Sequence, residues 1–142
     1  MDGGASRCLA AARVVFVVYT LALVTATHWP GLAVRGPVER TDLLVHIGAF
    51  GGWALLLGAT RWLRARGRPA REGLRVCLVA VGFGVVDEVT QPLMSRVFDV
   101  LDLGANFTGA ALGGAAVTVV LLARARARGG VQGGARGGPD GG

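Results

Sequence analysis

Residues 87–114 of the chain read DEVTQPLMSRVFDVLDLGANFTGAALGG. This stretch places four carboxylates, one arginine and two amides inside or beside segments that are otherwise apolar. Pro92 disfavours helical backbone at Gln91 and has no N–H to donate, so it predicts that one helix ends or kinks there and another begins beyond it. Ionisable groups are costly in lipid, and in membrane proteins they mark functional sites by default.

The composition of the whole chain indicates a small membrane protein. It has 142 residues, of which 52% are apolar and 17% are charged, and its mean hydropathy is +0.53. At 1.5 Å per helical residue, an apolar run of about 20 residues crosses the ~30 Å hydrocarbon core of a bilayer. Four runs approach this length: Leu9 to Thr27, Leu43 to Thr60, Leu74 to Gln91 and Leu101 to Ala123. The sequence therefore predicts an all-α fold, a four-helix transmembrane bundle.

The placement of the arginines predicts the orientation of this bundle. All 15 basic residues are arginine, and most lie in residues 61–75 and in the C-terminal tail, whereas residues 87–102 carry an excess of carboxylates. Because cytoplasmic loops are enriched in Arg and Lys, both termini are predicted to be cytoplasmic, in a bacterial plasma membrane. A cleaved signal peptide is the alternative for the first helix, but its apolar run is long and Arg13 can reach the cytoplasmic interface.

The chain divides into three predicted segments and shows few other chemical signals. Residues 1–8 form a short cytoplasmic N-terminus, residues 9–125 the membrane domain, and residues 126–142 a disordered Gly/Arg-rich tail. The sequence pI of 11.2 comes from arginines that lie next to helix ends. No aromatic side chains accompany them to stack on bases, so we expect the partners to be membrane lipids and not nucleic acid. Cys8 and Cys77 are too far apart for a thiolate cluster, and we assign no metal and no cofactor.

Nine polar residues are predicted to meet at the extracytoplasmic ends of the second, third and fourth helices. They are Asp42, His46, Asp87, Glu88, Gln91, Arg96, Asp99, Asp102 and Asn106. Helical residues three or four apart share a face, so each helix carries a polar stripe. Gly109 and Gly113 continue the stripe of the fourth helix as small residues, which allow helices to approach closely.

The depth of Asp87 makes it the central suspect. It follows Arg75 by a stretch that rises about 18 Å as helix, which leaves it within the hydrocarbon and requires it to face protein or water. We expect a site with Asp87, Glu88 and His46 at its centre, opening outward as an acidic cup, and Arg96 orienting Asp99 or Asp102.

The polar residues give the sequence a resemblance to the VanZ-like membrane proteins, a family named for a factor that gives resistance to the lipoglycopeptide teicoplanin. The resemblance covers most of the chain. It is carried by Asp42, His46, Phe50, Asp87, Glu88, Gln91, Arg96, Asp99, Asp102, Asn106 and Gly109. The chain departs from the family pattern in two places. Leu43 stands where the family often has a lysine, so any role of that lysine would fall to Arg40. Pro92 and Leu93 follow Gln91 where an aromatic residue is common in the family. The resemblance implies a membrane location and a resistance phenotype, not a reaction.

Four interpretations of the polar residues remain open at the sequence level. They form an interhelical clamp, a binding site for a cationic or amphiphilic envelope component such as a lipid-linked wall precursor or a lipoglycopeptide, an enzyme active site, or part of a transport path. The enzyme interpretation takes His46, Asp87 and Glu88 as catalytic candidates exchanging protons on an envelope lipid, or holding a hard divalent metal in a variant of that scheme. His28 and Trp29, beside Pro30, are interpreted as an interfacial anchor.

Overall fold

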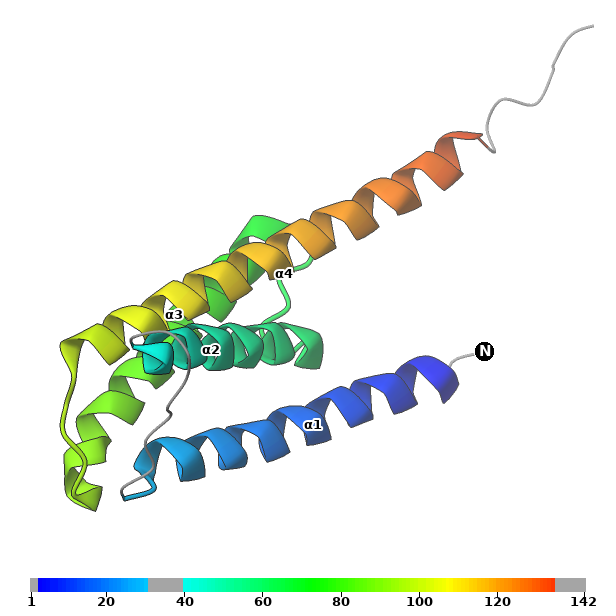
Figure 1. The fold of residues 1–142 in the computed structure, drawn as a ribbon. Helices are drawn as coiled ribbons and strands as arrows, with labels where there is room; N and C mark the ends of the chain where they lie inside the picture. The colour runs from blue at the N-terminus through cyan, green and yellow to red at the C-terminus, as the bar shows by residue number, and fades with distance from the viewer. Residues whose placement is uncertain (1–2, 31–39, 135–142) are drawn as a thin grey trace, which may run out of the picture.

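The computed structural model describes residues 3–30 and 40–134, with side chains as far as residue 128. The fold is all-α, with four α-helices and one short 3-10 helix in the described residues. They are α1 (Gly3–His28), α2 (Thr41–Thr60), α3 (Pro69–Thr90), η1 (Gln91–Met94) and α4 (Val100–Gly134). Successive α-helices alternate in direction, so the end of α1, the start of α2, the end of α3 and the start of α4 lie together (Figure 1).

Three of these helices are long and apolar enough to cross a membrane: α1, α2 and residues Val100–Arg128 of α4. This indicates a multi-pass helical membrane protein. The third predicted span, α3, is long enough but is not apolar enough to count as a candidate membrane span, because charged residues occupy both of its ends. Arg71, Glu72 and Arg75 lie in its first turns, and Asp87 and Glu88 lie in its last.

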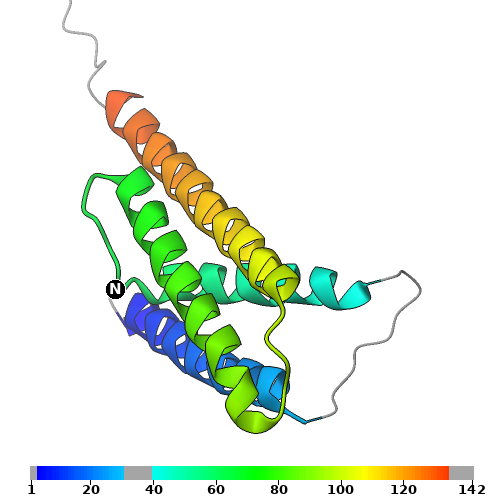
Figure 2. The same cartoon turned by 90° about the vertical axis from the view of Figure 1, so that its left-hand side faces the viewer.

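The helices pack around α4, which contacts both α2 and α3, while α1 lies against α2 (Figure 2). Glycines bring the backbones of α2 and α4 together. A Cβ at Gly113 would lie 2.7 Å from the carbonyl oxygen of Gly51, and one at Gly109 would collide with the carbonyl oxygen of Ile47. The prediction that Gly109 and Gly113 are close-packing positions is therefore confirmed.

An aromatic core fills the space beside this glycine contact. Phe50 is fully buried, and its ring centroid lies 5.7 Å from that of Phe83. Phe83 also stacks on Trp53 at 4.4 Å, and Trp53 donates a hydrogen bond from Nε1 to the Thr20 hydroxyl of α1 at 2.9 Å. These contacts tie α1, α2 and α3 below the polar side chains described next.

The helix boundaries extend the predicted ones and correct one of them. Pro69 begins α3 because the first helical position needs no N–H donor, and the turn around Pro92 is η1, which ends at Ser95 in the left-handed region (φ 60°). The tail was predicted to be disordered from residue 126, but α4 continues to Gly134. A long helix propagates more easily than a new one nucleates, which favours this continuation. Residues 135–142 lie outside the described residues.

Candidate functional site

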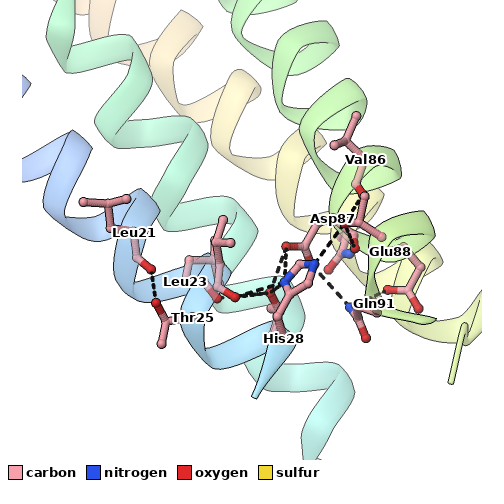
Figure 3. A network of polar contacts seen from close by, with 12 residues as sticks. Leu21, Leu23, Thr25, His28, Val86, Asp87, Glu88 and Gln91 are labelled. Atoms are coloured by element: carbon pink, nitrogen blue, oxygen red, sulfur yellow. Dashed lines mark hydrogen bonds and ion pairs between the residues drawn. The ribbon is translucent and has the colours of Figure 1, made fainter. Parts of the chain in front are cut away.

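The polar residues gather where the four helix ends meet, a region we call the polar end. It comprises the end of α1, the start of α2, the end of α3 with η1, and the start of α4. Figure 3 shows its α1 and α3 side, where His28 lies beside Asp87 and Gln91. Most of the predicted residues meet here, and α1 adds side chains that the sequence analysis left out.

Asp87 is buried, with 2% of its surface exposed, and it is held from two helices. The Thr27 hydroxyl of α1 donates to its Oδ1 at 2.8 Å, and the Gln91 amide donates to its Oδ2 at 3.4 Å. His28 Nδ1 lies 3.7 Å from the same Oδ1, which places a potential cation beside the carboxylate. Charge buried away from water is tolerated when it is paired and hydrogen-bonded. Asp87 has the hydrogen bonds, and a protonated His28 would supply the pair.

Glu88 is fully buried and fixes the approach of α4. Its Oε1 accepts a hydrogen bond from the Asp99 backbone N–H at 2.8 Å, and its Oε2 accepts from Gln91 Nε2 at 3.2 Å. Asp99 in turn accepts the Leu101 N–H at 2.7 Å, one of the donors that a helix start leaves free. The expected acidic cup is therefore corrected: Asp87 and Glu88 are inside the protein, because these contacts draw them toward neighbouring helices.

His46 links α2 to α4 at the centre of the polar end. Its Nδ1 lies 2.8 Å from the side-chain oxygen of Asn106, and its Nε2 lies 3.7 Å from Oδ2 of Asp102. The imidazole also stacks on Phe50 with an interplanar angle of 6°. Within the part of the chain that the structure describes, Oδ1 of Asp102 and Nδ2 of Asn106 are buried with no hydrogen-bond partner.

The starts of α2 and α4 are joined by Arg40. Its Nη2 lies 3.3 Å from Asp99 Oδ2 and 3.9 Å from Asp42 Oδ2. These side chains are more than a third exposed, so the attraction is weakened by solvent. Arg40 reaches Asp99 because it immediately precedes α2, whose start lies beside that of α4. The expectation that Arg96 orients Asp99 or Asp102 stays a prediction.

A small pocket of about 90 Å³ opens beside these groups. Its polar lining comes from Thr27, His46 and Arg96, and the remaining lining residues are apolar, including Leu23 and Ala26. Arg96 therefore lies in the predicted site, in contact with this pocket. Thr27 thus belongs both to the lining of this pocket and, through its hydroxyl, to the contacts of the buried Asp87 carboxylate.

Sequence reasoning missed Thr27, His28 and Thr90 as members of the cluster. His28 Nε2 lies 2.9 Å from the Thr90 hydroxyl, and its Nδ1 lies 3.0 Å from the Thr27 hydroxyl. The signal available was topological: in an alternating bundle the end of the first helix lies at the same membrane level as the end of the third. His28, interpreted as an interfacial anchor, is instead a partly buried member of this cluster, while Trp29 is exposed.

The donor set and the comparisons with known proteins limit what can be assigned. The described residues contain no group of three or more His, Cys, Asp or Glu side chains placed to hold a metal ion. No protein family, curated protein or solved structure matches the chain. The arrangement can hold a polar group at the pocket and can exchange a proton between His28 and Asp87.

Proposed function

We propose that the chain is a four-span, VanZ-like membrane protein whose polar end binds the polar part of a cell-envelope amphiphile and lowers susceptibility to teicoplanin-type lipoglycopeptides. In this proposal α3 is the fourth span, since its 22 residues rise about 33 Å as helix. Both termini are cytoplasmic, and the polar end faces outward. The resemblance carried by Asp42, His46, Asp87 and Glu88 supplies the phenotype.

The pocket lined by Thr27, His46 and Arg96 is the observation that carries the binding proposal. It combines a cation and hydrogen-bonding groups with apolar side chains in about 90 Å³, which suits a small polar group of an amphiphile. A clamp alone explains less, because interhelical polar contacts in membranes contribute only about 0.6 kcal/mol on average. An interhelical clamp also does not explain why Oδ1 of Asp102 and Nδ2 of Asn106 are buried without a hydrogen-bond partner among the described residues.

An acid/base enzyme acting on an envelope lipid is the second candidate, and one contact favours it. The Thr27 hydroxyl lies within hydrogen-bonding distance of both Asp87 Oδ1 (2.8 Å) and His28 Nδ1 (3.0 Å). In one state a protonated His28 donates from Nδ1 to the Thr27 oxygen while the Thr27 hydroxyl donates to ionised Asp87. In the other state a protonated Asp87 donates to the Thr27 oxygen while the hydroxyl donates to the unprotonated Nδ1 of His28. Switching between these states moves a proton between carboxyl and imidazole, as general acid/base catalysis requires.

Susceptibility of a sensitive bacterial host tests the proposed function. Expression of the wild-type chain should raise the inhibitory concentration of teicoplanin more than that of vancomycin, which lacks the lipid tail. Ala26→Leu, which places bulk at the mouth of the pocket on an exposed position, should abolish the protection. Ala11→Leu adds the same bulk to an exposed position near the other end of α1 and should leave protection unchanged.

The double variant Asp87→Asn/Glu88→Gln separates a site from a clamp. At a binding site the variant reaches normal membrane abundance but loses protection, whereas a clamp loses folded protein. Envelope lipid masses are measured in the same strains. A change in lipid mass with wild type only would favour the enzyme, and lack of protection by the wild type would refute the resistance phenotype.

A further inference from the structure

A second candidate binding site lies at the opposite end of the bundle, where α2 ends, α3 begins and α4 leaves the packed core. A pocket of about 380 Å³ there is lined by six arginines and one glutamate. The arginines are Arg61, Arg64, Arg66, Arg68, Arg124 and Arg128, and the acid is Glu72. We call it the arginine pocket. Its net charge is strongly positive because a single carboxylate opposes six guanidinium groups.

The arginine pocket continues into an apolar groove of about 510 Å³ between α1, α2 and α4. The two share Arg61, Leu121 and Arg124, so a bound molecule can extend from one into the other. Beyond these residues the groove is lined mainly by apolar and small side chains, such as Leu9, Leu55 and Val120. A basic pocket at one end and an apolar groove at the other match a molecule with an anionic head and hydrocarbon chains.

A buried carboxylate organises the loop that supplies the arginines. Glu72 is 3% exposed, its Oε1 lies 3.5 Å from Arg61 Nε, and its Oε2 accepts the Ala65 backbone N–H at 3.1 Å. Arg61 has a left-handed backbone (φ 61°), a conformation that such contacts must hold in place for a residue other than glycine. Glu72 therefore partly neutralises Arg61 and leaves the exposed arginines of the loop and of α4 available to an anion.

Trp62 indicates where the membrane surface lies relative to this pocket. The ring is half-exposed, packs edge-on against Phe16 at 5.5 Å, and has the Arg13 guanidinium 6.0 Å from its centroid. Tryptophan prefers the headgroup level of a bilayer. This preference favours a position of the neighbouring arginines at the level of the lipid phosphates, with the groove running from there along the hydrocarbon.

We propose that the arginine pocket and its groove bind one anionic phospholipid, with the headgroup phosphate on the arginines and an acyl chain between α1, α2 and α4. Guanidinium groups bind phosphate oxygens in pairs and remain charged at all physiological pH values. Basic pockets between transmembrane helices on the cytoplasmic side are established sites for anionic headgroups. This site is separate from the polar end and does not depend on the function proposed for it.

Native mass spectrometry of the full chain in detergent tests the proposal with dioleoyl phosphatidylglycerol, which is anionic, and dioleoyl phosphatidylcholine, which has the same chains and no net charge. The anionic lipid should be retained preferentially. Arg64→Gln/Arg124→Gln should weaken its binding by about thirty-fold, since each arginine near an anionic headgroup contributes about five-fold in affinity. Arg71→Gln/Arg75→Gln, exposed residues of α3 outside the pocket, should weaken it by less than about three-fold.

The groove is tested by Ala59→Trp, which fills it from an exposed position without changing charge, against Ala111→Trp on an exposed face of α4. Only the first should reduce retention of the anionic lipid. Equal retention of the two lipids, or equal losses in the two arginine double variants, would overturn the proposal. Displacement by millimolar inorganic phosphate would also overturn it, since the pocket would then recognise a free anion.

Discussion

Thr27 joins α1 to the buried carboxylate of Asp87 through one hydroxyl group at 2.8 Å. Thr27→Val keeps the shape of the side chain but removes that donor, so we expect it to lower the free energy of unfolding by about 1–2 kcal/mol. Thr27→Ser retains the hydroxyl and should lose about 0.5 kcal/mol or less, chiefly from the lost methyl group. Unfolding in mixed detergent and dodecyl sulfate micelles, followed by circular dichroism, measures both. Equal stability of the two variants would show that the bond to Asp87 contributes nothing.

Asp87 could be recognised as a site residue from the sequence, whereas Thr27 could not. A carboxylate inside an apolar segment is recognisable from sequence because its burial is costly. Asp87 and Glu88 are indeed buried and share Gln91, while His46 lies against Asp102 and Asn106. Threonine carries no such signal, since it satisfies its own hydroxyl within a helix, as Thr25 does with the Leu21 carbonyl. Asp87 and Glu88 are buried because Thr27 of α1 and the Asp99 backbone contact them. Residue spacing along α3 alone could not predict these partners.

At the scale of elements, the contact between α2 and α4 depends on glycine. Gly109→Leu would drive a side chain into the Ile47 backbone and separate the two helices, and we expect a loss of more than about 2 kcal/mol. Gly104→Leu lies on the same helix with open space around it and should leave stability unchanged or slightly improved. Micelle unfolding and membrane abundance measure both variants. A stable, abundant Gly109→Leu protein would contradict the close backbone approach.

The helices themselves were predictable because their apolar runs are long, whereas their ends and neighbours were not. Pro92 lies close to the end of α3, but Gln91 keeps helical backbone (φ −55°, ψ −39°), so the expectation that proline disfavours helix there was wrong, and the chain passes directly into η1. The position of α1 beside α2, and of its last turn beside Asp87, follows from packing that no local pattern encodes. For the same reason the contact of Arg40, just before α2, with Asp99, just before α4, could not be predicted from chain proximity.

For the whole molecule, the separation of charge between the two ends predicts the orientation in the membrane. The end with the arginine pocket should be cytoplasmic and the polar end outside, because arginine-rich loops are retained in the cytoplasm. Single cysteines test this in a background where Cys8 and Cys77, both free in the structure, are replaced by serine. Met94→Cys lies in η1 at the polar end, and Ala70→Cys lies in the first turn of α3 at the other end; both positions are exposed.

A membrane-impermeant maleimide added to intact cells should label Met94→Cys at least about tenfold faster than Ala70→Cys, because the bilayer excludes a charged reagent. Permeabilised cells should label both positions, which controls for the reactivity of each thiol. The reverse pattern would place the buried carboxylates near the cytoplasm, and the resistance proposed for the polar end would then lose its route to an extracellular drug. Equal labelling in intact cells would mean that α3 does not cross the membrane, since the two residues lie at its opposite ends.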